Sequence, residues 1–304
     1  MKIVCITPVD HLFRVKSILE SKGEVIYRPH IKKQELSDLL DEDKDIDTIF
    51  TNPNKQGFVL DASVIGHSSI RTICTASTGL NHIDIDFCRF KNIRVCSLTT
   101  DYEFLNTIPA TAEHAFALTS SLIRQIPQSA QSVKDGKWDY EPFVGRQMQE
   151  LRFGVIGCGR LGNMYASYAR AFSGKRVLIC DPYKFKYEFS LQEIFELCDV
   201  ISLHVHVSDE TRGMINKRLF RKPFYLINTS RGEIVNEEDI IEGIEKKIVL
   251  GYATDVVTDE FGDISKSPII NASKIHDNII VTPHVGGMTL ESQNQAFEYA
   301  ANKL

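Results

Sequence analysis

A glycine-containing run in the middle of the chain, GCGRLG at residues 157–162, restricts the fold more than any other feature of the sequence. The apolar run FGVI precedes it, and the helix-compatible run MYASYARAF follows it. Between a strand and a helix, glycines with this spacing permit a tight turn and let a pyrophosphate approach the helix N-terminus. The pattern therefore predicts a dinucleotide-binding unit built on a parallel sheet.

An acidic residue follows the next expected strand of that unit. The run RVLIC ends at Asp181, nineteen residues after Gly162. A carboxylate at this position accepts hydrogen bonds from a ribose 2′-hydroxyl and repels a 2′-phosphate. Pro182 follows it, where an arginine would favour the phosphorylated cofactor. The sequence therefore predicts NAD, in preference to NADP, as the cofactor.

Strand and helix signals alternate along the chain, which predicts an α/β protein with mainly parallel sheets. A length of 304 residues exceeds the usual single core, so we expect two domains. Helices are expected from Pro109 to about Ser132 and, after the capping residue Thr289, at the C-terminal end. The expected strands are short apolar runs, at residues 2–6, 24–27, 47–50, 71–75, 93–97, 153–157, 176–180, 199–205, 224–229, 247–256 and 278–284.

Composition excludes several classes of protein. The chain has 35 Lys and Arg against 40 Asp and Glu, a net charge of −5, which argues against a nucleic-acid surface. No apolar run approaches the roughly 20 residues of a membrane helix, and the N-terminus lacks a secretory signal pattern. The seven cysteines form no CxxC motif, and we expect reduced, buried thiols in a cytoplasmic protein. We expect no metal site: His204 and His206 are assigned local hydrogen bonds, and His82 and His114 structural roles.

Three stretches after residue 225 each place one chemically active side chain where a buried strand is expected to end. They read INTSRGEIVN with Arg231, YATDVVTDEFG with Glu260 and IIVTPHVGG with His284. Each opens with a short apolar, β-prone run, as buried strands of a parallel sheet do. Ligands of open α/β sheets bind at the carboxyl ends of the strands. Together the three residues provide an anion anchor, a general acid/base and a carboxylate beside a nicotinamide site. This combination indicates hydride chemistry on a small molecule that carries a carboxylate.

Six separated motifs resemble, in order, those of the D-isomer-specific 2-hydroxyacid dehydrogenase family, most of all its D-3-phosphoglycerate dehydrogenase-like branch. They are TASTGLNHIDID (75–86), TAEHAFAL (111–118), VIGCGRLG, DVISLHVHVSDETRGMIN, INTSRGEIVNEEDI and VTPHVGG. The resemblance covers nearly the whole chain. It implies two Rossmann-like domains, each with a mainly parallel sheet flanked by helices, and a nucleotide domain inserted into the substrate domain. The substrate domain is then expected at residues 1–100 plus 286–304, the NAD-binding domain at residues 101–285, and the active site in the cleft between them.

The resemblance also implies a role for each matching residue. Arg231 pairs with the carboxylate and the 2-oxygen of a D-2-hydroxy or 2-oxo acid, and His284 exchanges a proton with that oxygen. Glu260 fixes the imidazole and favours its charged form. The other substrate contacts are expected at Ser77, Thr78 and Gly79. The cofactor contacts are expected at Thr78, Gly157, Gly159, Arg160, Leu161, Gly162, Asp181, Val205, Thr229, Ser230, Arg231, Asp255, His284, Gly286 and Gly287.

Some alternatives stay open at this point. Phe261 follows Glu260 where the family usually has proline, so the adjacent Asp259 is a rival for the carboxylate role. The segment TNPNKQGF (51–58) offers Lys55 and two asparagines, Asn52 and Asn54, but no arginine. Its composition weakens 3-phosphoglycerate as the substrate and equally suits a neutral, hydroxyl-rich acid. A different class of function, an NAD(H)-sensing corepressor that binds partner peptides, is the alternative to an enzyme.

A homodimer is the expected assembly, since the family resemblance places the subunit contact around the nucleotide domain. The expected helix from Pro109 to about Ser132 carries more apolar side chains than one domain flank needs. We expect this helix at the subunit contact, with Leu122 facing outward.

Overall fold

The computed structural model describes residues 1–53, 57–184, 189–260 and 262–304; Asn54, Lys55 and Phe261 lie outside these ranges. The chain forms two compact units, Met1–Ile108 with Met288–Leu304, and Pro109–Gly287. The divisions fall close to the expected ones at 100/101 and 285/286. Residues 101–108 join the first unit because Leu105 is buried in its core.

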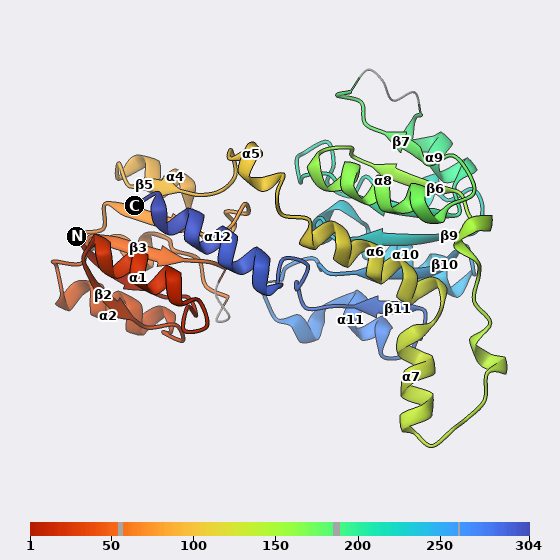
Figure 1. The fold of residues 1–304 in the computed structure, drawn as a ribbon, viewed down its shortest axis with the longest axis horizontal. Coiled ribbons are helices and arrows are strands. Elements are labelled where there is room, and N and C mark those ends of the chain that lie inside the picture. Colours follow the sequence, from red (N-terminus) through yellow and green to blue (C-terminus); the bar gives the residue numbers. More distant parts are fainter. Residues whose placement is uncertain (54–56, 185–188, 261) are drawn as a thin grey trace. The chain divides into compact units, whose positions relative to one another are not determined.

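The first unit contains a five-stranded, entirely parallel sheet with the strand order β2-β1-β3-β4-β5 (Figure 1). Its strands are mostly buried apolar runs of three or four residues. They are β1 (Lys2–Cys5), β2 (Glu24–Tyr27), β3 (Thr48–Thr51), β4 (Thr72–Thr75) and β5 (Arg94–Cys96). All five lie within one residue of the runs that the sequence predicts.

Helices pack on both faces of this sheet. One core contains Leu36, Val64 and Cys88, which come from helices of one face. The other contains Val15 and Phe297, so the C-terminal helix returns to the first unit. The helices are α1 (Phe13–Lys22), α2 (Lys33–Glu42), α3 (Ala62–Ile65), α4 (Ile85–Phe90), α5 (Tyr102–Leu105) and α12 (Leu290–Asn302). The side chain of Thr289 caps α12 by accepting a hydrogen bond from the backbone N–H of Ser292, as predicted.

The second unit contains a six-stranded parallel sheet with the order β11-β10-β9-β8-β6-β7 (Figure 1). The six strands are β6 (Phe153–Ile156), β7 (Leu178–Cys180), β8 (Val200–Leu203), β9 (Phe224–Asn228), β10 (Val249–Thr254) and β11 (Ile279–Val281). Two parallel sheets with helices on both faces confirm the predicted fold class. Within each unit the carboxyl ends of the strands lie at one edge of the sheet, which is where the candidate site residues follow.

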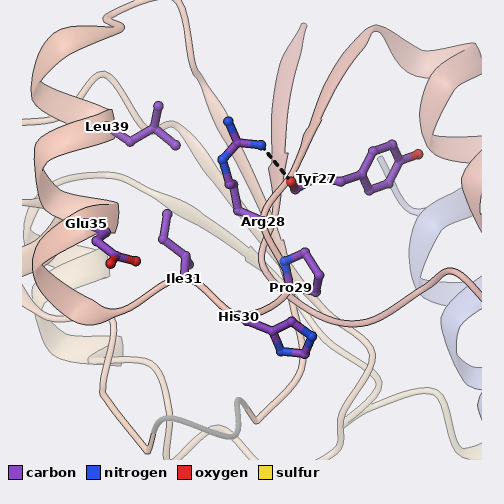
Figure 2. Close-up of a pocket in the computed structure, with 7 residues that line it drawn as sticks. All are labelled: Tyr27, Arg28, Pro29, His30, Ile31, Glu35 and Leu39. Atoms are coloured by element: carbon purple, nitrogen blue, oxygen red, sulfur yellow. Dashed lines mark hydrogen bonds between the residues drawn. The ribbon is translucent and has the colours of Figure 1, made fainter.

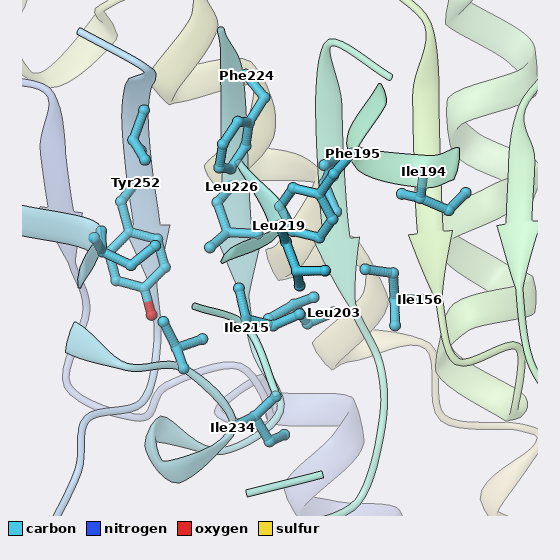
Figure 3. Packing of buried hydrophobic residues seen from close by; sticks show 14 of the residues in the cluster. Ile156, Ile194, Phe195, Leu203, Ile215, Leu219, Phe224, Leu226, Ile234 and Tyr252 are labelled. Carbon is cyan, nitrogen blue, oxygen red and sulfur yellow. The ribbon is translucent and has the colours of Figure 1, made fainter. Parts of the chain in front are cut away.

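Two apolar cores flank the second sheet. In one, shown in Figure 3, Ile156, Leu203, Leu226 and Tyr252 of the strands pack with Phe195 of a flanking helix. The other core joins the sheet to α6 and α8. The helices are α6 (Ala110–Ile123), α7 (Ile126–Lys134), α8 (Arg160–Phe172), α9 (Leu191–Leu197), α10 (Glu237–Glu245) and α11 (Pro268–Ser273). Short 3-10 turns join them at Glu141–Phe143, Met148–Glu150, Lys217–Leu219, Gly232–Ile234 and Ile264–Lys266.

The expectation of one helix from Pro109 to about Ser132 is wrong. The helix α6 ends at Ile123, Gln125 adopts a left-handed conformation with φ of 51°, and Pro127 lies in the first turn of α7. Proline lacks the N–H that a continuous helix needs, which explains the break. The expectation that Leu122 faces outward is also wrong, because it is only 4% exposed and belongs to the core between α6 and α8.

All seven cysteines are buried thiols that form no disulfide with one another. Among the described residues, no helix is both long and apolar enough to span a bilayer. The same residues contain no group of three or more His, Cys, Asp or Glu side chains arranged to hold a metal ion. Structural roles fit two of the histidines that the sequence singles out. His82 is buried beside the hydroxyl of Thr75, with its Nε2 atom 3.0 Å from the oxygen, and His204 lies 2.9 Å from the hydroxyl of Ser202.

Candidate active site

The glycine run lies between β6 and α8, as the sequence predicts. Gly157 has φ of 83°, and a Cβ atom there would lie 2.5 Å from the carbonyl oxygen of His204. Glycine is therefore required at this position both by conformation and by space. Gly159 precedes the first residue of α8, and apart from its two chain neighbours no described residue has a heavy atom within 4 Å of where its Cβ would be. The helix N-terminus thus opens onto free space, the arrangement in which backbone N–H groups bind a phosphate.

Asp181 follows β7 and lies beside this turn. Its carboxylate accepts hydrogen bonds from the backbone N–H groups of Cys158 at 2.8 Å and Tyr183 at 3.1 Å. The residue is 9% exposed. These contacts hold an anionic acceptor next to the glycine turn. The carboxylate is placed to accept a hydrogen bond from a ribose hydroxyl, and its charge would repel a 2′-phosphate.

The other predicted cofactor residues also follow strands of this sheet. Val205 comes after β8, Thr229 and Ser230 come after β9, and Ser230 donates a hydrogen bond to the carbonyl oxygen of Leu203 at 2.8 Å. The buried hydroxyl oxygen of Thr229 has no hydrogen-bond partner among the described residues. A buried polar atom without a partner is costly, and a bound ligand group would satisfy it. The open glycine turn and this unsatisfied hydroxyl both fit a dinucleotide.

Arg231, Glu260 and His284 follow β9, β10 and β11, which are neighbours in the sheet. The strands run parallel, so their carboxyl ends share one edge. Gly232 lets two of the loops approach closely, because a Cβ atom there would lie 2.0 Å from the backbone carbon of Val257. The prediction that these three stretches meet at one edge of the sheet is confirmed.

Arg231 is a partly buried cation without a counter-ion among the described residues. One guanidinium nitrogen, Nη1, donates to the carbonyl oxygen of Ser230 at 2.7 Å, and no described carboxylate lies within salt-bridge distance. Its charge acts on His284, where it opposes protonation. A partly desolvated guanidinium without a counter-ion is a strong site for a carboxylate, which it binds in bidentate geometry.

His284 and Glu260 form a hydrogen-bonded pair, with Nδ1 of the imidazole 2.6 Å from Oε2 of the carboxylate. The hydrogen bond to Glu260 raises the pKa of His284, against the opposing effects of desolvation and of the Arg231 charge. Half of the imidazole side chain stays exposed, while that of Glu260 is 22% exposed. Nδ1 faces the carboxylate, so Nε2 is the nitrogen available to a ligand.

The rival carboxylate, Asp259, makes no such contact. Its side chain is exposed and lies over Gly262, where a Cβ atom would be 2.1 Å from its Oδ2. Asp259 itself adopts a left-handed backbone conformation with φ of 57°. The geometry therefore favours Glu260 as the partner of the imidazole.

Asp255, expected near the nicotinamide, is 2% exposed and is surrounded by donors from its own unit. Although burial opposes ionisation, hydrogen bonds from His114, Thr282 and the backbone of Val285 and Gly286 keep the pKa of Asp255 below its ordinary value. The residue thus anchors the loop that carries His284. Gly286 belongs to this anchored loop, and Gly287, which is exposed, ends the second unit.

Two further residues that hold loops of the site did not enter the predicted site. The side chain of Thr282 donates to Asp255, and Glu237, which is buried at the start of α10, accepts a hydrogen bond from the backbone N–H of Thr258 at 2.9 Å. Neither role has a local sequence signal, because each contact joins residues more than 20 positions apart. Burial raises the pKa of Glu237, whose Oε2 has no partner among the described residues.

Ser77, Thr78 and Gly79 lie in the first unit, in the turn after β4. The backbone N–H of Gly79 donates to the hydroxyl of Ser77 at 3.1 Å, and the carbonyl of Thr78 accepts from the hydroxyl of Thr99 at 2.9 Å. The turn follows the carboxyl end of its strand, as expected for a ligand-binding loop of an open sheet.

A cavity of about 420 Å³ also occurs in the first unit, where β2 leads into α2 (Figure 2). Two of its polar side chains make local hydrogen bonds. Arg28 donates to the carbonyl oxygen of Tyr27 at 3.0 Å, and Glu35 accepts from the backbone N–H of Lys32 at 3.0 Å. None of the predicted site residues lines this cavity, whose walls are Tyr27, Arg28, Pro29, His30, Ile31, Glu35 and Leu39.

Curated relatives resemble this chain over most of its length. D-3-phosphoglycerate dehydrogenase of Bacillus subtilis is 34% identical over 237 residues, which cover 74% of this chain and 43% of the relative. The enzyme of that name from Methanocaldococcus jannaschii is 30% identical over 300 residues, which cover 94% of this chain and 54% of the relative. The chain thus spans about half the length of these relatives.

A solved structure and a family model agree with these relatives. D-lactate dehydrogenase from Aquifex aeolicus, solved in complex with NAD and lactic acid, superimposes with a TM-score of 0.78 at 26% identity. The match covers 100% of this chain and 94% of that one. Residues 116–286 match the family model described as D-isomer specific 2-hydroxyacid dehydrogenase, NAD binding domain. The chain belongs to the D-isomer-specific 2-hydroxyacid dehydrogenase family.

Proposed function

We propose that this protein is an NAD-dependent oxidoreductase that transfers a hydride between nicotinamide and a small D-2-hydroxy acid or 2-oxo acid. The observation that carries the proposal is the edge formed by β9, β10 and β11. It combines a partly buried Arg231, which has no counter-ion among the described residues, with an imidazole whose Nδ1 is held by Glu260 and whose Nε2 is available. A fixed cation beside a proton donor suits a substrate that carries a carboxylate next to a carbonyl or hydroxyl group.

In this proposal Arg231 binds the substrate carboxylate and the 2-oxygen, which orients the carbon that reacts. When bound, the nicotinamide supplies or accepts the hydride. During reduction His284 gives the proton on Nε2 to the 2-oxygen as the hydride reaches C2, and during oxidation it takes the hydroxyl proton. Glu260 accepts the hydrogen bond from Nδ1 and stabilises the imidazolium. Reduction thus consumes one hydride and one proton per molecule of 2-oxo acid.

We assign the dinucleotide to the carboxyl edge of the second unit. The open turn at Gly159 and the start of α8 would hold the pyrophosphate, Asp181 the ribose, and the unsatisfied hydroxyl of Thr229 a nearby polar group. Asp255 would lie near the nicotinamide and would retain its hydrogen bonds to the loop that carries His284. The remaining proposed contacts are Thr78, Gly157, Arg160, Leu161, Gly162, Val205, Ser230, Arg231, His284, Gly286 and Gly287.

The turn that contains Ser77, Thr78 and Gly79 is proposed to bind the substrate carboxylate through backbone N–H groups. The identity of the substrate acid is restricted only by the chemistry of the side chains proposed to bind it. Asn52, which follows β3, offers an amide to hydroxyl groups. We therefore keep both phosphorylated and hydroxyl-rich, sugar-derived 2-oxo acids as candidate substrates.

A substrate screen tests the function directly. Consumption of NADH is followed over a panel of 2-oxo acids, including phosphorylated and sugar-derived ones, with His284→Gln measured in parallel. We expect turnover of at least one acid by the unmodified protein and its near-complete loss in the variant. Binding of NADH without turnover of any panel member, in either direction, would contradict an enzyme and favour the NAD(H)-sensing corepressor alternative.

We further propose that the protein is a homodimer whose contact includes α7 and the chain that follows it. No residue of α7 is buried, although it begins with the half-exposed Ile126 and carries the half-exposed Val133. Beyond it Trp138 is 92% exposed and Tyr140 84% exposed. Large apolar side chains gathered on an exposed segment are typical of an interaction surface, and a second copy of the chain fits the family resemblance.

A cytoplasmic location belongs to the same proposal. Its support is the set of seven buried cysteines, which form no disulfide with one another. Thiols that stay reduced are the rule in reducing compartments and unusual in secreted proteins. Fractionation of cells that produce the protein, with NADH-dependent activity measured in each fraction, tests the location.

A further inference from the structure

The loop that carries His284 has an unusual backbone conformation. His284 has φ of 53°, in the left-handed region that non-glycine residues seldom occupy. Its backbone N–H donates to the carbonyl oxygens of Asp255 and Thr282, each at 3.0 Å. Such a conformation persists only where the surroundings hold it. The contacts around the loop therefore decide where the imidazole lies.

The buried carboxylate of Asp255 supplies most of these contacts. Its Oδ1 accepts from the hydroxyl of Thr282 at 2.5 Å and from the backbone N–H of Val285 at 2.9 Å. Its Oδ2 accepts from the backbone N–H of Gly286 at 2.7 Å. One side chain thus binds the loop on both sides of His284.

A second histidine, His114 of α6, completes the cluster. Its Nε2 lies 3.0 Å from the hydroxyl of Thr282 and 3.3 Å from Oδ1 of Asp255. The hydroxyl of Thr282 donates to the carboxylate, so the N–H of His114 is the donor toward Thr282. The side chain of His114 is 22% exposed, which makes it a partner within the fold and not a surface group.

We propose that His114 is a positioning residue for the acid–base histidine: through Thr282 and Asp255 it fixes the left-handed loop and thereby the alignment of His284 with Glu260. The inference rests on the proposed function in so far as it concerns catalysis. Without the His114 donor, the Thr282 hydroxyl can rotate away and the carboxylate loses one of its partners. The loop then samples other conformations, and the 2.6 Å contact between Nδ1 and Oε2 weakens.

The charged groups that act on His284 are Glu260, Arg231 and Asp255, and a His114 variant replaces none of these side chains. A shift in the titration of His284 would therefore report a change of geometry. The proposal predicts that His114→Leu lowers the titration midpoint of His284 toward that of an unperturbed histidine. It also predicts faster amide exchange at Val285 and Gly286, by about tenfold for the loss of one hydrogen bond.

Proton NMR of the imidazole Cε1–H groups provides the measurement without any substrate. The chain has nine histidines, and His284→Gln identifies the signal of His284. His114→Gln keeps an N–H donor near the position of Nε2 and should restore the unmodified titration. If His114→Leu fails to fold, Thr282→Val serves in its place, because it keeps the shape and removes the bridging hydroxyl.

Thr119→Val is the matched control. Thr119 lies on the same helix, is buried, and its hydroxyl lies 2.9 Å from that of Tyr165, away from the loop. An unchanged titration of His284 in both His114→Leu and Thr282→Val would overturn the proposal. An equal shift of the His284 titration in Thr119→Val would also overturn the proposal, because it would indicate a general loosening of α6. Once the screen has identified a substrate, His114→Leu should lower kcat with little change in KM.

The two proposals fail separately. A shifted titration in a protein that turns over no 2-oxo acid would contradict the proposed function and leave the positioning role intact. Turnover with an unshifted titration would contradict the positioning role alone.

Discussion

The Nδ1 atom of His284 lies 2.6 Å from Oε2 of Glu260, although 24 residues separate them in the sequence. The contact directs Nδ1 of the imidazole toward Glu260, so Nε2 faces away from that carboxylate. It also raises the pKa of His284 above its ordinary value of 6.5. The imidazolium form, which donates the proton during reduction, therefore persists to a higher pH than in an unperturbed histidine.

The first prediction is a pH dependence. Reduction of a 2-oxo acid needs protonated His284, so its rate should fall as the pH rises through the raised pKa of that residue, above 6.5. Oxidation needs the neutral imidazole and should rise over the same range. Glu260→Gln removes the stabilising carboxylate and should move both limbs to lower pH. Asp259→Asn is the control, since Asp259 does not contact the imidazole. Rate–pH profiles in both directions check the prediction, and a larger shift in Asp259→Asn would reverse the assignment.

Replacing His284 tests the acid–base role itself. We expect His284→Ala to lower kcat by a factor on the order of 10² or more, because general acid/base catalysis contributes about that much. Binding of NADH should survive, since the glycine turn and Asp181 are untouched. Steady-state rates and a fluorescence titration with NADH measure the two effects. Near-normal turnover would remove His284 from the mechanism.

Arg231→Lys tests the geometry of anion binding separately from its charge. Lysine keeps the positive charge but cannot offer two parallel N–H groups to a carboxylate. We expect KM for the acid to rise and kcat to fall together, because orientation of the reacting carbon is lost as well as affinity. Lys222→Arg, at a partly buried ion pair with Asp199, is a control in which neither constant should change. A change in KM alone would mean that Arg231 binds the substrate and the transition state equally well and does not orient the reacting carbon.

The sequence predicts those parts of this fold that depend on local pattern. The strands that bear Arg231, Glu260 and His284 are short buried runs, and a strand of that kind is recognisable within a few residues. In a parallel sheet all strands end at the same edge, so the convergence of these residues followed once the strands were recognised.

The errors and omissions come from contacts that no local pattern encodes. The apolar side chains of α6 indicate burial but not which face is covered, so Leu122 looked like surface and is core. The break before α7 needs Gln125 in a left-handed conformation, which its sequence does not require. The partnership of His114 with Asp255 joins residues far apart in the sequence and depends on how α6 packs on the sheet. Tertiary contacts of this kind decide the precision of the site.

Asp181 should decide the choice of cofactor. Its carboxylate is held beside the glycine turn by two backbone N–H groups, where it would repel a 2′-phosphate. We expect the unmodified protein to bind NADH clearly better than NADPH, and Asp181→Ala to narrow the difference. Titrations of both cofactors, followed by fluorescence, measure it. Equal affinity of the unmodified protein for the two cofactors would contradict the assignment.

The last prediction separates the core of the second unit from its proposed subunit contact. Leu122 packs against Gly251: a Cβ atom on Gly251 would lie 2.9 Å from Cδ1 of Leu122. Because the leucine side chain fills this space, Leu122→Ala leaves a cavity. Such substitutions cost about 2–5 kcal/mol of folding free energy, and we expect a lower melting temperature without a change in the oligomer.

Trp138→Ala should do the opposite. Its side chain is 92% exposed, so the folding stability of the subunit should change little while the dimer weakens. Light scattering over a concentration series, together with thermal unfolding of both variants, distinguishes the two effects. A monomeric unmodified protein at working concentration would contradict the dimer. It would leave the assignments of Arg231, Glu260 and His284 untouched, because all three come from one chain and one sheet edge.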